Sequence, residues 1–425
     1  MNGFDIAAVV VAVTTATGYI NHRFVRLPAT TGTLVVALFC SGLVVLIDHL
    51  APDQHLEASI AQFLGAVDFE RILLRGMLSF LLFAGALTVE LEALLDSRWT
   101  IVALATVGVV ISTVVVGTVT YFLFGLLKLE APFPVCLTFG ALISPTDPIA
   151  VLGLLKQLHA PQELEAQIAG ESLFNDGVGV TLFLVVAAMA GLSSGSHVEG
   201  GGFHAASFLL FGLREVVGGV LCGLAAGYFG YRVLKTVDEP ALELLMTLAL
   251  VMSLYSFSFA IDVSGPLAVV VAGLIIGNQG RRFAMSDRTR GQVDAFWNMI
   301  DEILNAVLFL LLGLEVLAVR DWSPVLLPAI LAVPACLLAR FVSVALPVAV
   351  IGLRRPMRRG LIPVLTWCGL RGGISVAMVL SLPAFPLKDV LLASTYAVVV
   401  FSVLVQGLTI RRVLVRYGVG QQGSN

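Results

Sequence analysis

The sequence predicts an all-α polytopic membrane protein with about 13 transmembrane helices. Of its 425 residues, 58% are hydrophobic and 12% are charged, and the mean hydropathy is +0.98. Soluble domains carry about 25% charged residues. Apolar runs of about 20 residues, the length that crosses a bilayer as a helix, recur along the whole chain. The stretches between them are too short for a soluble domain, so residues 1–425 are predicted to form one polytopic transmembrane domain.

Hydropathy places the expected helices in order along the chain. Their approximate extents are residues 4–21, 28–48, 72–92, 100–127, 132–155, 164–191, 206–234, 241–261, 264–279, 295–319, 324–353, 360–383 and 387–410. The first run lacks a basic region before it and a clear small-residue cleavage site. We therefore interpret it as a retained span and not as a cleaved signal peptide.

The basic residues support this order of spans. Lys and Arg cluster after each odd-numbered span, at Arg23/Arg26, Arg98, Lys156, Arg232/Lys235, Arg281/Arg282/Arg288/Arg290, Arg354/Arg355/Arg358/Arg359 and Arg411/Arg412/Arg416. The intervening loops, such as "DHLAPDQHLEAS" and "GLSSGSHVEGGG", are poor in both. Cytoplasmic loops carry the excess of Lys and Arg. We therefore predict an inner (plasma) membrane protein with its N-terminus outside and a short cytoplasmic tail at 411–425.

Several classes of function are disfavoured. The five cysteines are spread singly through apolar segments, so neither a disulfide framework nor a zinc site is expected. No basic run indicates a nucleic-acid partner. An intramembrane enzyme would need a motif such as HExxH, GxSxG or a Cys/His pair, and none is present. We expect no cofactor, and the short tail leaves an ion gradient or diffusion as the source of energy.

Two prolines interrupt the fifth expected span at "SPTDPIAV", Ser144 to Val151. Pro145 and Pro148 flank Thr146 and Asp147, and because proline displaces the preceding residue from helical geometry, the helix should open here. Open backbone at membrane depth survives where it is buried or lines a cavity, and such breaks form ion sites in secondary transporters. The alternative is a proline kink with a capping aspartate.

A polar face follows in the sixth span, at "GESLFNDGVGV". Ser172, Asn175 and Asp176 are spaced i, i+3 and i+4 and share one side of a helix, and Glu171 and Asn175 are also four residues apart. An ionised group at mid-span costs about 2.5–3.5 kcal/mol and usually marks an ion pathway. Oxygen ligands suit a monovalent cation, and a carboxylate can instead bind a proton. The alternative is a structural polar network, which for Glu171 has equal support.

Two arginines lie in apolar surroundings further along. Arg340 is mid-span in "CLLARFVSVAL", and Arg371 stands beside Gly372-Gly373 in "GLRGGISVAMVLSLP", where glycines loosen the helix. Buried arginines need partners. Glu171 and Asp147 are the candidates, and a purely structural ion pair is the favoured interpretation for Arg340.

Acidic residues also occur in the tenth span, "FWNMIDEILNAVLFLLLGLEV". We expect Asp301 and Glu302 near its cytoplasmic end. They either face a funnel that gathers cations or anchor the helix at the interface.

Taken together, the motifs resemble the monovalent cation:proton antiporters, in particular the electroneutral sodium/proton exchangers of the NhaP/NHE type. The resemblance covers essentially the whole chain. It rests on five motifs in the family's order: "SPTDPIAV", "GESLFNDGVGV", "SGPLAVVVAGLIIGN", "DEILNAVLFLLLGLE" and "GLRGGISVAMVLSLP".

The resemblance implies roles for the polar residues. Asp176 would bind cation and proton alternately, with Asn175 beside it. Asp147, Ser172 and Thr146 would complete the cation shell. The neutral Asn175 stands where electrogenic relatives carry a second acid, which implies exchange of one cation per proton.

The same resemblance implies an architecture. Glu171 would pair with Arg340, and Arg371 would sit in a second broken helix that crosses the first. Two inverted six-helix repeats with a linker helix would place a moving core at about 100–191 and 324–410. The remaining helices would form a dimerisation scaffold, so a homodimer is expected.

One position departs from the family pattern. Relatives often carry an acid before Ala-Gly in the third span, where "LLFAGAL" has Phe83. The choice among Na⁺, Li⁺ and K⁺ therefore stays open. The alternative from another class is a cation channel or proton-leak pathway, although the polar residues concentrate at one depth and are too few to line a pore.

Overall fold

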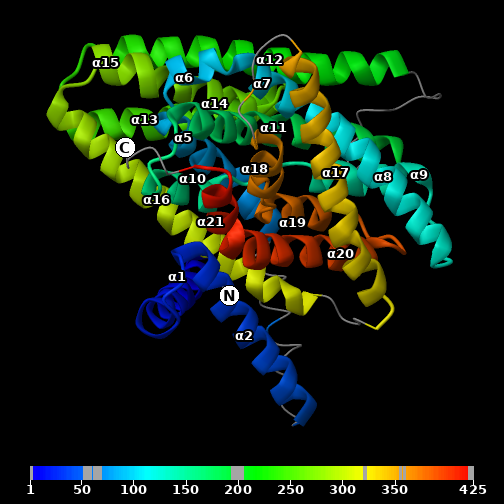
Figure 1. Cartoon of the computed structure of the whole chain (residues 1–425). Coiled ribbons are helices and arrows are strands. Elements are labelled where there is room, and N and C mark those ends of the chain that lie inside the picture. The colour runs from blue at the N-terminus through cyan, green and yellow to red at the C-terminus, as the bar shows by residue number, and fades with distance from the viewer. Residues whose placement is uncertain are drawn as a thin grey trace.

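The computed structural model describes residues 3–50, 60, 69–192, 205–318, 323–353, 357 and 360–419. Within them the chain forms thirteen consecutive helical segments (Figure 1). In order these are α1 (Gly3–Ile20) with η1 (Asn21–Val25); α2 (Ala29–Leu50); α4 (Phe69–Ile72), η3 (Leu73–Met77) and α5 (Leu78–Thr88); α7 (Arg98–Ala103), η4 (Leu104–Gly108) and α8 (Val109–Leu126); α9 (Phe133–Ile143) and α10 (Ile149–Gln157); α11 (Gln162–Met189); α12 (Ala205–Leu234); α13 (Pro240–Ala260); α14 (Gly265–Ile275), η5 (Ile276–Gly280) and α15 (Arg281–Phe283); α16 (Asp287–Leu314) with η6 (Glu315–Ala318); α17 (Leu326–Gly352); α18 (Leu361–Cys368) and α19 (Gly373–Leu380); α20 (Lys388–Phe401), η7 (Ser402–Gln406) and α21 (Gly407–Arg416). A short helix, α6 (Leu91–Asp96), precedes α7.

The predicted fold class is confirmed, because each expected span coincides with one of these segments. Eight segments of the described chain are long and apolar enough to cross a membrane without interruption. The other five include α9–α10 and α18–α19, which are each broken in the middle. Helix α16 begins eight residues before its expected start, because Ser286 accepts a hydrogen bond from the Thr289 N–H and caps a charged first turn that hydropathy does not detect.

The helices pack in two groups that meet at α11. In one group α8 contacts α9 and α17, and α17 contacts α20; in the other, α14 contacts α5, α12 and α13. Helix α11 contacts both α9 and α14. In Figure 1, α12 runs along the edge of the molecule opposite α1 and α2. Helix α11 is therefore placed to bring its polar residues between the groups.

Small residues allow the closest helix contacts. A Cβ on Gly140 would lie 2.2 Å from the Thr113 carbonyl oxygen, so α9 and α8 approach to backbone contact. A Cβ on Gly223 would lie 2.4 Å from the Ala268 carbonyl oxygen, between α12 and α14. Because lipid tails are as apolar as the side chains, such close packing is a main source of helix association in membranes.

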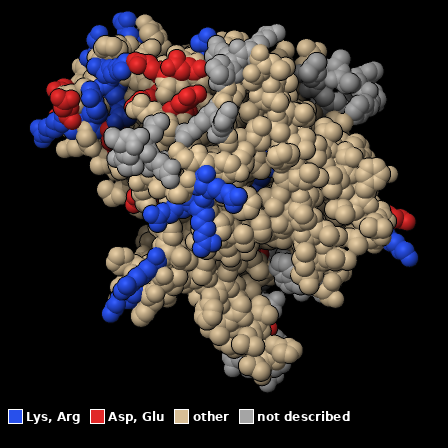
Figure 2. Space-filling view, viewed as in Figure 1, with Lys and Arg blue, Asp and Glu red and all other residues tan. Residues whose placement is uncertain are grey.

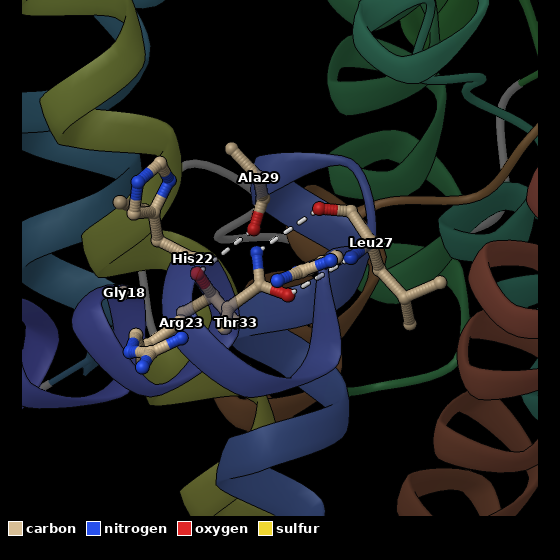
Figure 3. A pocket seen from close by; sticks show the side chains of 9 residues that line it. Gly18, His22, Arg23, Leu27, Ala29 and Thr33 are labelled. Carbon is tan, nitrogen blue, oxygen red and sulfur yellow. Dashed lines mark hydrogen bonds between the residues drawn. The ribbon is translucent and has the colours of Figure 1, made fainter.

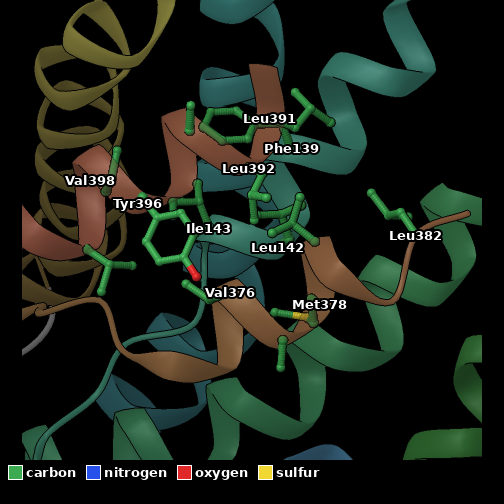
Figure 4. Close-up of a cluster of buried hydrophobic side chains, with 14 of the residues drawn as sticks. Phe139, Leu142, Ile143, Val376, Met378, Leu382, Leu391, Leu392, Tyr396 and Val398 are labelled. Atoms are coloured by element: carbon green, nitrogen blue, oxygen red, sulfur yellow. The ribbon is translucent and has the colours of Figure 1, made fainter. Parts of the chain in front are cut away.

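An apolar core joins the half-helices α9 and α19 to α20 (Figure 4). Its labelled members are Phe139, Leu142, Ile143, Val376, Met378, Leu382, Leu391, Leu392, Tyr396 and Val398, all buried. This core fixes the half-helices relative to each other, and so fixes the ends that face the two breaks.

The outer surface is largely uncharged. In Figure 2, charged residues gather over the end of the molecule that carries α6 and α15 and around α21. There the exposed Arg282 and Glu92 form an ion pair of 2.7 Å. Large apolar side chains such as Phe122, Leu126 and Phe229 are mostly exposed, as expected for lipid-facing positions.

Some predictions fall partly outside the described residues. These include Arg354, Arg355, Arg358 and Arg359, most of the two loops poor in basic residues, and residues 420–425 of the tail. The structure continues the last helix to Arg416, so the first part of the predicted tail is helical. The orientation of the termini stays a prediction.

Candidate cation and proton site

Two broken helices cross at the centre of the site. Helices α9 and α10 are separated by Ser144–Pro148, and α18 and α19 by Gly369–Gly372, as the proline and glycine patterns predict. The breaks form one isolated antiparallel bridge, in which the Asp147 N–H donates to the Leu370 carbonyl oxygen at 2.8 Å. Each break therefore satisfies part of the other's open backbone, which a bilayer cannot do.

Arg371 ties the second break to the first. Its Nη1 donates to the Ser144 carbonyl oxygen, and also to the Pro145 carbonyl oxygen at 2.8 Å. These carbonyls lie at the C-terminal end of α9, where a helix leaves acceptors unpaired. The Arg371 N–H donates to the Ser402 hydroxyl at 2.8 Å. Arg371 thus binds carbonyl oxygens, whereas the sequence suggested the Asp147 carboxylate; the two residues meet through backbone instead.

Glu171 and Arg340 form a buried two-pronged ion pair. Arg340 Nη1 bonds Glu171 Oε1, and Nη2 lies 3.1 Å from Oε2. Nη2 also donates to the Leu365 carbonyl oxygen at 2.9 Å. A Cβ on Gly369 would lie 2.2 Å from Arg340 Nε, so this position has room only for glycine. The pair connects α11 to α17 and to the end of α18.

The polar face of α11 holds the first break. Asn175 Nδ2 donates to the Thr146 hydroxyl at 2.8 Å, and the Thr146 N–H donates to Asn175 Oδ1 at 3.3 Å. The Ser172 hydroxyl donates to the Thr146 carbonyl oxygen. The structure therefore brings Thr146, Asn175 and Ser172 together, and both ends of the Asn175 amide are occupied.

The two acidic residues lie beside this contact. Asp147 Oδ1 accepts from the Ile149 N–H at 3.0 Å and caps α10. A Cβ on Gly372 would lie 2.4 Å from Asp147 Oδ2, so the second break passes directly against this carboxylate. Asp176 is 6% exposed, makes no hydrogen bond or ion pair with any described residue, and lies within electrostatic range of Asp147.

Two glycines after Asp176 position α11. A Cβ on Gly179 would lie 2.4 Å from Pro145 Cγ, and one on Gly177 would lie 2.5 Å from Leu267 Cγ. The helix can therefore press against the first break on one side and α14 on the other. This explains why the letters "GVG" follow the acid in the sequence.

Other residues took roles that sequence patterns did not single out. Ser402 had no distinguishing signal, because a lone serine in an apolar helix is common. Asn278, in the "LIIGN" motif, accepts from the Leu91 N–H at 2.8 Å and donates to the Val89 carbonyl oxygen at 3.0 Å, which fixes the connection after α5. Phe83, which the sequence did single out, is fully buried, with its ring centroid 4.8 Å from that of Trp297.

Asp301 lies farther along its helix than expected. Because α16 starts at Asp287, Asp301 falls near the middle of the helix, and it lies within electrostatic range of Asp147. Asp301 is half-buried and Glu302 is exposed. The funnel interpretation suits Asp301, and the anchoring interpretation suits Glu302.

A separate pocket opens where α1, η1 and α2 meet (Figure 3). Its volume is about 740 Å³, and His22, Arg23 and Arg26 are among the residues that line it. Across its floor Asn21 bonds both backbone polar groups of Leu27, at 3.1 and 3.2 Å. None of the predicted site residues lines this pocket, so it is distinct from the crossing.

Residues 9–416 match the transmembrane sodium/hydrogen exchanger family, which is nearly the whole chain. The chain belongs to the sodium/hydrogen exchanger family. Among other members, the Na⁺/H⁺ antiporter NhaP of Pseudomonas aeruginosa is 43% identical over 98% of this chain and 97% of the relative. The Na⁺/H⁺ antiporter NhaH of Halobacillus dabanensis is 35% identical over 90% and 91%.

The fold of this exchanger-family chain also matches a solved structure. The sodium proton antiporter MjNhaP1 of Methanocaldococcus jannaschii superposes with a TM-score of 0.72 over 97% of each chain, at 18% sequence identity. The likeness shows that the two share a fold.

Proposed function

We propose that this protein is a secondary active antiporter that exchanges Na⁺ for H⁺ across the membrane, with Asp176 as the carboxylate that binds them in turn. The observation that carries the proposal is that Asp176 is buried at the crossing without a hydrogen-bond partner among the described residues. Relatives that match nearly this whole chain are named Na⁺/H⁺ antiporters, which supports Na⁺ over Li⁺ or K⁺.

The mechanism is competition for one carboxylate. Asp176 accepts a proton or, with Asp147, Ser172 and Thr146 supplying oxygens, a cation. An unloaded charge is costly at membrane depth, and either ligand lowers that cost. Exchange follows because only the two loaded forms cross. A channel would instead need a continuous polar path, whereas the side chains that bond Thr146 lie together at the crossing.

We infer an electroneutral ratio of one cation per proton. Asn175 carries no charge, and both ends of its amide bind Thr146, so it offers no second titrating group. An imposed membrane potential should therefore leave the exchange rate unchanged. A clear rate change on imposing the potential would contradict this ratio.

The moving core that we propose comprises residues of about 100–191 and 324–410, and the remaining helices form the scaffold of a homodimer. The packing of α8, α9, α17 and α20 into one group and of α5, α12, α13 and α14 into another supports this division. Alternating access would then slide the crossing past the scaffold helices, with cations entering from the cytoplasmic side past Asp301.

The test is Asp176→Asn in proteoliposomes, with Na⁺-driven proton movement as the readout. The substitution keeps the size of the side chain and removes the exchanging charge, so exchange should be abolished. Asp287→Asn is the matched control, because the Asp287 side chain is fully exposed. Retained exchange in Asp176→Asn would remove Asp176 from this role, and a single-channel current in the wild type would favour the channel.

A further inference from the structure

A small cavity lies beside the crossing. It is bounded by α17, by the second break and by α20 with η7, and its walls include the apolar side chains of Val333 and Val398. Three polar residues reach it: Arg340, Arg371 and Gln406. The space open to the centre of a water-sized particle is about 10 Å³. This is room for one particle of about that size.

Each of the two arginines that line this cavity has one N–H group without a partner among the described residues. Arg340 Nε and Arg371 Nη2 are both fully buried and bond no acceptor among the described residues. The two side chains are themselves 7% and 3% exposed. A buried donor without an acceptor costs about 1–3 kcal/mol, and more when it is charged. More than nine-tenths of buried polar groups are paired, so two orphaned donors at one cavity point to a ligand that accepts from both.

The charges around the cavity do not cancel. Arg340 is neutralised by Glu171. Arg371 makes no ion pair with a described carboxylate, and its acceptors are the carbonyl oxygens of Ser144 and Pro145. The cavity therefore lies in the field of one uncompensated positive charge, in surroundings where an unpaired charge is expensive.

We propose that this cavity is a binding site for one small monovalent anion of halide size, held by Arg340 Nε–H and Arg371 Nη2–H. An anion supplies acceptors for both donors and the negative charge that Arg371 lacks. The apolar walls favour a weakly hydrated ion such as chloride or bromide, and the small volume excludes sulfate. Gln406 donates to the Trp367 carbonyl oxygen at a long 3.4 Å, so its amide is free to turn an N–H toward the anion.

The anion would give the second break a fixed counter-ion. Arg371 could then keep its contacts to the end of α9 whether Asp176 holds a cation, a proton or neither. This inference concerns anion binding alone, so its test is independent of the test of the proposed exchange.

The experiment is equilibrium binding of radioactive chloride to the purified full-length protein, in sodium gluconate at constant Na⁺ and ionic strength. Wild type should bind chloride saturably, at one ion per chain. Bromide should compete and sulfate should not. Val398→Leu in α20 and Val333→Leu in α17 each add one methylene to a side chain that lines the cavity, and each should weaken chloride binding about tenfold or more, a free-energy change of about 1.4 kcal/mol.

Val405→Leu is the matched control, because Val405 is 41% exposed in the same stretch and does not line the cavity. It should bind chloride as wild type does. Thermal midpoints in gluconate check that each variant is folded. One folded wall variant is enough to decide the test. No saturable binding in wild type overturns the proposal, as does binding that a folded wall variant leaves unchanged or that sulfate displaces as well as bromide does.

Discussion

The two broken helices both open their backbone at the crossing, but the residues at the two breaks carry opposite charges. The first break, Ser144–Pro148, is made by prolines and carries the acidic Asp147. The second, Gly369–Gly372, is made by glycines and carries the basic Arg371. The first is held by α11 side chains that bond Thr146. The second is held through the arginine's own N–H groups.

This difference separates the titrating part of the site from the fixed part. A carboxylate can take up a proton or a cation, so the acidic side of the crossing, where Asp176 of α11 lies near Asp147, can change its charge with its load. A guanidinium stays charged in proteins, so the basic break provides a constant field. In the exchange that we propose, Asp176 of α11, beside the first break, is the group whose charge varies, and Arg371 in the second break is the group whose charge stays constant.

The largest expected effect comes from Glu171, which joins α11 to α17 through its ion pair with Arg340. Glu171→Gln leaves the Arg340 charge buried without its counter-ion, and removal of one partner of a buried pair costs about 3–5 kcal/mol. We expect a clear fall in the thermal midpoint and loss of exchange. The double variant Glu171→Leu/Arg340→Met should be more stable than Glu171→Gln, because it buries no unpaired charge. Equal stability of Glu171→Gln and wild type would contradict the structural role.

A smaller effect should follow from pressing the breaks apart. In Gly372→Ala the new Cβ would meet the Asp147 carboxylate at 2.4 Å, so the crossing must shift. Exchange should fall about tenfold or more, since displacements near 1 Å at a reacting site have effects of order 10²-fold. Gly153→Ala is the control, because nothing lies within 4 Å of its Cβ. If the two variants exchange at the same rate, the contact between the breaks does not affect exchange.

The smallest expected effect concerns the support of the basic break alone. Ser402→Ala removes the acceptor of the buried Arg371 N–H, which should lower stability by about 1–3 kcal/mol. Asp176 keeps its surroundings, so the affinity for Na⁺ should be unchanged. Ser381→Ala serves for comparison, because its hydroxyl bonds only the Met378 carbonyl oxygen one turn back. A larger change in Na⁺ affinity than in stability for Ser402→Ala would argue against the separation of the breaks.

The sequence predicts most of the fold because lipid imposes simple rules. Apolar length marks the spans, and proline or glycine beside a charge marks each break. The scarcity of charge also limits the partners of each buried arginine to Glu171 and Asp147. The family resemblance matched Glu171 with Arg340, and the structure has them in contact.

The remaining details depend on backbone groups, which every residue carries and which leave no mark in the sequence. The sequence suggested a carboxylate partner for Arg371. It could not indicate the carbonyl oxygens of Ser144 and Pro145 that Arg371 binds. The charged start of α16 was missed because hydropathy detects the apolar part of a helix and not its polar extension. As a result, Asp301 was placed near the end of a helix in which it lies at the middle.

We propose that one carboxylate, Asp176, binds either one proton or one Na⁺. Titration of Na⁺ into purified protein across a pH series, in paired buffers of different ionisation enthalpy, measures both the affinity and the protons released. As pH falls below the pKa of the site, Na⁺ affinity should drop about tenfold per pH unit, with one proton released per Na⁺ bound. Asp176→Asn should abolish both the pH dependence and the proton release. An Na⁺ affinity that is independent of pH in wild type, or proton release that persists in Asp176→Asn, would contradict the account.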